Sequence, residues 1–233
     1  MKTLAIDTAN QVLGVALFQD KDLIGQYVTN LKKNHSVRLM PAINQLMEGT
    51  GTTPDELGKI AVSKGPGSYT GIRIGLSTAK TFAWALNIPI VGVSSLEVLS
   101  YQGRFYDGCV CPFFDARRNN VFTGLYHWKN NKMELIRDEQ NVSMEDWLHA
   151  LKSLNRPVLF LSPDIDRYHN QIDMIMGDHA IIPVGDCHMA NPSHLVLVAN
   201  SKPFDDTHTL TPNYLRLAEA EAKWIQSQKR SEG

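Results

Sequence analysis

Apolar residues in the first third of the chain form short runs that predict a sheet. Three runs follow one another, at 4–7, 12–18 and 23–31, and each has the length and composition of a strand. Asp20, Lys21 and Asp22, between the last two runs, predict a hairpin turn. The sheet is therefore expected to begin as an antiparallel meander.

Helical spacing then alternates with further strands. Within 35–48, four apolar residues share one helical face: Leu39, Ile43, Leu46 and Met47. The following stretch predicts strands at 60–63 and 88–93, a long apolar helix that ends at Leu86, and a helix at 94–102. This order is typical of an α/β layer arrangement.

The second half of the chain has a weaker pattern of the same kind. It predicts strands at 110–114, 120–128 and 158–161, and helices at 143–154, 165–176, 192–200 and 217–229. Ser143 begins a sequence that resembles a capping box for the first of these helices. Glycines near 101–108 indicate a lobe boundary, so we expect units at 1–103 and 104–233.

The charge balance limits the functions open to the chain. Its 233 residues carry 23 Lys+Arg and 24 Asp+Glu, for a formal net charge of −1. A protein that binds RNA on its own usually has a basic excess, because phosphate contacts supply much of the affinity. Any role with RNA is therefore expected to be indirect.

Cysteine usage and the N-terminus indicate a cytoplasmic protein. The three cysteines, Cys109, Cys111 and Cys187, are too few and odd in number for a disulfide framework. An acid, Asp7, occurs within seven residues of the start, so no signal peptide is expected. No apolar run reaches the roughly 18–20 residues of a membrane span.

The run from Gly65 to Gly71 between a strand and a helix is the strongest local motif. Glycines there permit close backbone approach, and amides at a helix N-terminus can hold an anion. The other interpretation is a tight turn with nothing bound. The spacing matches neither a Walker A motif nor G-x-G-x-x-G, so both interpretations stay open.

Longer stretches resemble one family. GPGSYTGIRIGLSTAKTFAWALNIPIVGVSSLEVL at 65–99 resembles the TsaB family, also called YeaZ. The opening KTLAIDTA, NHSVRLMPAI at 34–43, FDARRNNVFTGLY at 114–126 and PNYLRLAEAEAKW at 212–224 resemble the same family. Together they span nearly the whole chain.

The resemblance implies an actin-like ATPase fold (ASKHA, ribonuclease H-like) with two lobes, and a catalytic paralogue, TsaD. TsaD-like sequences carry a His-x-x-x-His pair on a helix, a spacing that suits a metal site. Ser95 and Leu99 stand at those two positions here. We therefore expect no catalytic residues and no metal site in this chain.

The resemblance also implies a partner surface on the helix at 35–48 and on the long helix after the glycine loop. It would bind TsaD in a heterodimer, form a homodimer when the chain is alone, and work with a TsaE ATPase. The expected interface residues are His35, Leu39, Ile43, Leu46, Ile74, Thr78 and Phe82. The alternative is that both helices simply cover the sheet.

A nucleotide site is implied less directly. Candidate phosphate-binding residues are Asp7, Thr8, Gly65, Gly67 and Ser68, although Asp7 and Thr8 are also typical of a turn after a strand. We expect no cofactor held stably by this chain alone, and ATP or ADP at an interface shared with TsaD. Arg73, Asp115, Arg117 and Arg118 are expected at an interface or in structural roles.

The implied function is that of a non-catalytic scaffold. With TsaD and TsaE, the chain would support formation of the threonylcarbamoyl group on adenosine 37 of tRNAs that read codons beginning with A. Two alternatives remain at this stage. The chain is an independent small kinase or metalloprotease of the same fold, or it is an adaptor that controls TsaD levels.

Overall fold

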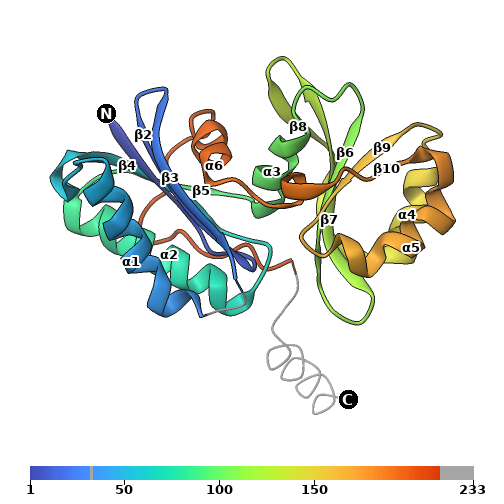
Figure 1. The fold of residues 1–233 in the computed structure, drawn as a ribbon, viewed down its shortest axis with the longest axis horizontal. Helices are drawn as coiled ribbons and strands as arrows, with labels where there is room; N and C mark the ends of the chain where they lie inside the picture. The colour runs from blue at the N-terminus through green and yellow to red at the C-terminus, as the bar shows by residue number, and fades with distance from the viewer. Residues whose placement is uncertain (32–33, 216–233) are drawn as a thin grey trace, which may run out of the picture.

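The computed structural model describes residues 1–31 and 34–215 and contains two five-stranded sheets (Figure 1). The first sheet has the order β3-β2-β1-β4-β5. Its strands are β1 (Lys2–Asp7), β2 (Val12–Gln19), β3 (Asp22–Asn30), β4 (Leu57–Ser63) and β5 (Ile90–Val93). β1 to β3 form the predicted antiparallel meander, and β4 and β5 run parallel to β1.

The second sheet repeats this topology. Its order is β10-β9-β6-β7-β8, with an antiparallel meander from β6 to β8 and with β9 and β10 parallel to β6. The strands are β6 (Cys109–Asp115), β7 (Asn120–Lys129), β8 (Lys132–Ser143), β9 (Val158–Leu161) and β10 (Ala180–Ile181). The chain therefore consists of two related lobes, each built around one sheet.

Each sheet carries a pair of helices on its outer face (Figure 1). In the first lobe these are α1 (His35–Gly49) and α2 (Tyr69–Leu86), which enclose an apolar core with the sheet. In the second lobe they are α4 (Met144–Lys152) and α5 (Ile165–Met176), with a core of their own. None of the described helices is long and apolar enough to cross a membrane.

Two helices lie between the sheets, and each packs on the sheet formed by the other half of the chain. α3 (Ser95–Ser100) comes from the first half but packs on β6, β7 and β8, whereas α6 (Pro192–Ala199) comes from the second half and packs on the first sheet. The two helices also touch each other. A single apolar core joins them to both sheets. Each of the predicted units, 1–103 and 104–233, thus contributes one helix to the sheet of the other.

The pattern of elements agrees with the sequence prediction except at a few positions. β8 and β10 were not predicted, and the helix predicted at 94–102 ends at Ser100 and continues as a 3₁₀ turn. Ser143 is the last residue of β8 and occupies the N-cap position of α4, but its side chain makes no capping hydrogen bond. The helix predicted at 217–229 lies outside the described residues.

Candidate functional site

A cleft of about 680 Å³ lies between the two lobes. One wall is formed by the turn after β1 and by the N-terminal ends of α1 and α2, and the opposite wall by the end of β6 and the turn that follows it. The lining residues are Asn10, Gln11, Asn34, His35, 66–71, Ile74, 114–117, Phe122, Asp164 and 213–215. The cleft therefore collects part of the predicted site residues from both halves of the chain.

The glycine loop is packed against the turn that follows β1. The backbone N–H of Ser68 donates a 2.7 Å hydrogen bond to Ala9 O, and the Ser68 side chain caps α2 by accepting from Gly71 N at 3.2 Å. A Cβ on Gly67 would lie 2.2 Å from Ala9 O. The close approach of the chain's own backbone thus explains why this position is glycine, and a role in phosphate binding stays a prediction.

Asp7 and Thr8 serve the same turn. The Asp7 side chain is buried and accepts a 3.0 Å hydrogen bond from Ala9 N. Burial raises the pKa of this carboxyl, and the hydrogen bond from Ala9 opposes the shift. Thr8 Oγ1 donates to Gly71 O at 2.7 Å. Neither Asp7 nor Thr8 lines the cleft, their hydrogen bonds hold this turn in place, and a role in phosphate binding stays a prediction.

Helix α1 turns its predicted interface residues toward its own sheet. Leu39, Ile43 and Leu46 are buried in the core of the first lobe. His35, at the start of the helix, instead lines the cleft, where its Nε2 lies 2.7 Å from Asn10 O. The three apolar side chains hold the helix on the sheet and are not accessible to a partner in the isolated chain.

The accessible surface of α1 and α2 is formed by residues next to the buried ones on the same helices. Ile74 and Phe82 of α2 are half-buried against the core, and Thr78 is half-buried between them on the same stripe. The exposed large apolar side chains of α1 and α2 are Val37 at 69%, Met40 at 42%, Tyr69 at 45% and Trp84 at 69%. Single exposed apolar side chains are common on protein surfaces, so a partner surface on α1 and α2 stays a prediction.

Arg73 is held by two tyrosines. Its guanidinium carbon lies 3.8 Å from the ring centre of Tyr69, and its Nε donates a 2.7 Å hydrogen bond to the Tyr214 hydroxyl. The hydrogen bond to Tyr214 raises the pKa of Arg73. The two rings are stacked with centres 5.4 Å apart. Tyr214 was not among the predicted site residues, although the motif at 212–224 that contains it contributed to the family resemblance.

Asp115 organises the turn between β6 and β7. Its carboxylate accepts hydrogen bonds from Arg117 N at 3.0 Å and from the Tyr168 hydroxyl at 2.7 Å. Arg117, Arg118 and Asn119 have φ values of 65°, 54° and 60°, a conformation that is costly for residues other than glycine. The turn directs Arg117 to the cleft, whereas Arg118 is exposed and does not line it.

Helix α3 carries the two residues that stand where a histidine pair is expected in a TsaD-like sequence. Ser95 and Leu99 are both fully buried, and Leu99 is part of the core shared by the two lobes. Within residues 1–31 and 34–215, no three His, Cys, Asp or Glu side chains are grouped in a way that could hold a metal ion. The surroundings of α3 are those of a packed core.

Comparisons with known proteins identify the family. The family model for TsaD, described as tRNA N6-adenosine threonylcarbamoyltransferase, matches residues 22–224. A protein of Bacillus subtilis (strain 168), the tRNA threonylcarbamoyladenosine biosynthesis protein TsaB, is 51% identical over 98% of this chain and 100% of its own length. The chain belongs to the TsaB family.

Solved structures support the fold of this TsaB family member. A Pseudomonas aeruginosa protein described as similar to the peptidase YeaZ superposes with a TM-score of 0.80, at 22% identity, over 92% of this chain and 99% of its own. An inorganic polyphosphate/ATP-glucomannokinase from Arthrobacter gives 0.52 at 6% identity, over 86% and 99%. The predicted actin-like ATPase fold is confirmed, as is the resemblance to TsaB and YeaZ.

Proposed function

We propose that this chain is a non-catalytic subunit that acts with a TsaD enzyme and a TsaE ATPase. The product would be the threonylcarbamoyl group on adenosine 37 of tRNAs that read codons beginning with A. The Bacillus subtilis relative is named for threonylcarbamoyladenosine biosynthesis, and the chain is similar to it over its full length.

The burial of Ser95 and Leu99 is the observation that carries this proposal. A leucine side chain has no donor atom for a metal, and a neutral serine is a poor ligand. Both side chains are fully buried in a packed core, so a substrate could not reach them without rearrangement of α3. A catalytic role would need another set of residues.

The partner would dock on the exposed side of α1 and α2, where Val37, Met40 and Trp84 reach the solvent. In the absence of TsaD, a second copy of the chain would cover the same surface. With a net charge of −1, the chain would contribute little of the electrostatic attraction for tRNA, so contact with tRNA would pass mainly through TsaD.

A nucleotide would bind at the junction between this chain and TsaD rather than to this chain alone. His35 and Tyr69 line the cleft at the ends of the two helices that carry the partner surface. The glycine loop is already in contact with the chain's own Ala9. ATP or ADP would therefore need groups from TsaD to complete its site.

A drop-out reconstitution tests the proposal. Purified TsaD, TsaE, the adenylate-forming enzyme, ATP, threonine, bicarbonate and tRNA are incubated with and without this chain, and modified adenosine is counted. Product is expected only when the chain is present, and none from the chain alone. Equal product without the chain would contradict the scaffold role.

The same assay separates the alternatives. An adaptor that controls TsaD levels would bind TsaD without changing the reaction of the purified proteins. An independent kinase would consume ATP without TsaD, and a metalloprotease would cleave a peptide substrate and lose that activity with a chelator. Each of these outcomes would replace the scaffold proposal.

A further inference from the structure

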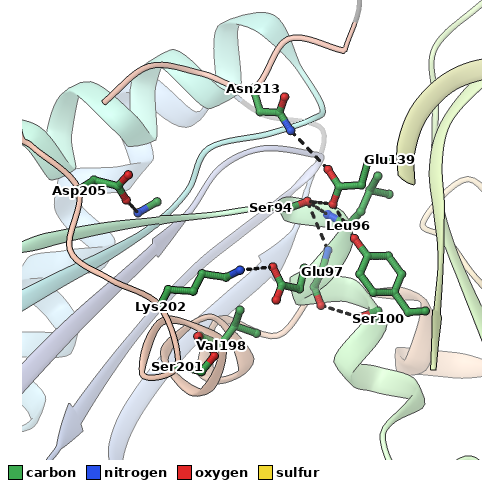
Figure 2. Close-up of polar contacts among 12 residues, drawn as sticks. Ser94, Leu96, Glu97, Ser100, Glu139, Val198, Ser201, Lys202, Asp205 and Asn213 are labelled. Carbon is green, nitrogen blue, oxygen red and sulfur yellow. Dashed lines mark hydrogen bonds and ion pairs between the residues drawn. The ribbon is translucent and has the colours of Figure 1, made fainter. Parts of the chain in front are cut away.

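A cluster of polar side chains lies between the two sheets (Figure 2). At its centre is the carboxylate of Glu139, which projects from β8. One carboxylate oxygen accepts hydrogen bonds from the Ser94 hydroxyl and, at 2.5 Å, from the Tyr126 hydroxyl. The other oxygen accepts from Asn213 Nδ2 at 3.3 Å. Three donors from three distant parts of the chain thus converge on a single side chain.

Two of these three hydrogen bonds join one lobe to the other. Ser94 directly follows β5 of the first sheet and caps α3, since its Oγ also accepts from Leu96 N at 3.2 Å. Asn213 is tied to the first sheet through its backbone N–H, which donates to Lys64 O at 2.7 Å. Tyr126 differs because it lies on β7, next to β8 in the same sheet as Glu139.

We propose that Glu139 is an interlobe lock that fixes the orientation of the two sheets and thereby the width of the cleft. The lock would act in the isolated chain and would not require the proposed partners. Asn213 belongs both to the lock and to the cleft wall. The next residue, Tyr214, stacks on Tyr69 at the N-terminal end of α2. Loss of the lock would therefore move a wall of the cleft.

A second polar contact also joins the two lobes. Lys202 Nζ, just beyond α6, lies 2.9 Å from a carboxylate oxygen of Glu97 on α3. Since α6 packs on the first sheet and α3 on the second, this ion pair also crosses between the lobes. Burial raises the pKa of Glu97, and Lys202 opposes the shift.

The lock has a role that the apolar core between the lobes does not fill. Apolar burial has no preferred direction in itself, so directional contacts add to what close packing alone specifies about the angle between the sheets. Hydrogen bonds to a carboxylate are directional and stronger than bonds between neutral groups. Polar groups between packed elements can select one arrangement among several that bury similar apolar area, and the hydrogen bonds of Glu139 are partly buried.

Distances between spin labels on the two lobes test the lock. Labels are placed at Asn44→Cys on α1 and Glu145→Cys on α4, both exposed, in a Cys187→Ser background; Cys109 and Cys111 are buried. Pulsed electron paramagnetic resonance then reports the distribution of distances between the lobes. With Glu139 present, a narrow distribution is expected.

Four variants of the lock separate its contributions. Glu139→Ala removes all three acceptor contacts, and Asn213→Asp places a like charge beside Glu139. Both are expected to give a distribution about twice as wide, because the two lobes would then rotate more freely relative to each other. Glu139→Gln is expected to keep the narrow distribution, because its oxygen accepts from both hydroxyls and its amide can donate to a reoriented Asn213. Tyr126→Phe is the matched control, since it removes a hydrogen bond to the same carboxylate but within one lobe.

An unchanged distribution in Glu139→Ala and Asn213→Asp would overturn the proposal, as would equal broadening in Tyr126→Phe. If Glu139→Ala does not fold, Asn213→Asp and Asn213→Ala decide the question. Both leave the carboxylate and the Ser94 cap in place and change only the link to the returning segment.

Discussion

Arg73 Nε donates a 2.7 Å hydrogen bond to the hydroxyl of Tyr214, although 141 positions separate the two residues. The bond fastens the segment that returns from the second half of the chain to the exposed side of α2. Stacking on Tyr69 further fixes the guanidinium, so an exposed arginine has a defined orientation before a partner arrives. Arginine and tyrosine side chains that lose little freedom on binding are typical of interface hot spots.

Replacement of Arg73 by lysine is therefore expected to weaken the complex with TsaD. Lysine keeps the charge but cannot stack on Tyr69 with a planar group or donate from an Nε. We expect the dissociation constant, measured by isothermal titration calorimetry, to rise about tenfold. Arg156→Lys, an exposed change on the other lobe, is the control. Equal affinities in the two variants would show that Arg73 does not contact the partner.

Val37→Asp tests the docking surface on α1. The Val37 side chain is 69% exposed, so an acid at this position should leave the fold and the melting temperature of the isolated chain nearly unchanged. A charge forced into an apolar contact costs several kcal/mol, so we expect loss of TsaD binding by at least about a hundredfold in a pull-down or calorimetric assay. Ile43→Asp would not distinguish binding from folding, because Ile43 is fully buried.

Met174→Asp is the matched control for that experiment. Met174 is 81% exposed on α5, on the outer side of the second lobe. It should bind TsaD as the unchanged chain does. If Met174→Asp abolished binding and Val37→Asp did not, the partner surface would lie on the second lobe.

Gly75→Ala is expected to destabilise the chain. A Cβ at Gly75 would lie 2.4 Å from Thr8 Oγ1, which is too close for an undistorted contact. Overpacking of this kind costs about 1–3 kcal/mol, and the higher helix propensity of alanine recovers less than about 1 kcal/mol. The free energy of unfolding in urea should therefore fall, and Thr8→Ala in the same chain should restore part of it.

Gly49→Ala provides the comparison for that loss. It also lies in a helix, but no heavy atom is within 4 Å of an added Cβ. Alanine there should raise the free energy of unfolding by up to about 1 kcal/mol. A similar loss at both positions would mean that contact with Thr8 is not the cause.

His194 should make the stability depend on pH in the acidic range. Burial lowers its pKa to about 4, with a smaller contribution from Arg104, whose Nη1 lies 2.6 Å from His194 Nε2. The unfolded chain takes up a proton near pH 6.5 and the folded chain only near pH 4, so stability falls as the pH decreases through this window. The expected loss is up to about 3 kcal/mol.

Urea unfolding between pH 7 and pH 4.5 measures this dependence. His194→Gln removes the titrating group and should flatten the curve, whereas His149→Gln, at an exposed position, should not. A curve with the same slope in all three proteins would show that His194 does not control acid stability.

The sequence predicted the first lobe well because its strands and helices have strong apolar patterns. β8 was missed because it is an edge strand of 12 residues in which only Met133 is buried and charged residues interrupt the apolar ones, and only pairing with β7 identifies it as a strand. Periodicity correctly placed Leu39, Ile43 and Leu46 on one helical face. It could not indicate that the chain's own sheet covers that face, since a core and an interface require the same residues.

The candidate site was predictable only in part, because some of its contacts form only in the tertiary fold. Motifs identified the glycine loop and Arg117, both of which reach the cleft. Glu139 and Asn213, separated by 74 positions, meet through the tertiary fold, and neither stands in a pattern that marks a polar cluster. Contacts of this kind are set by how the two sheets are packed, which no local pattern describes.

The position of α6 on the first sheet has a consequence for synthesis. The ribosome completes all five strands of that sheet by Val93, but the helix that covers its inner face ends only at Ala199. At roughly 5–20 residues per second, the inner face stays bare for roughly 5–20 seconds during translation. The nascent chain would therefore expose the apolar inner face of the first sheet until α6 has been synthesised. Chaperones that bind at the ribosome exit could cover this face during that time.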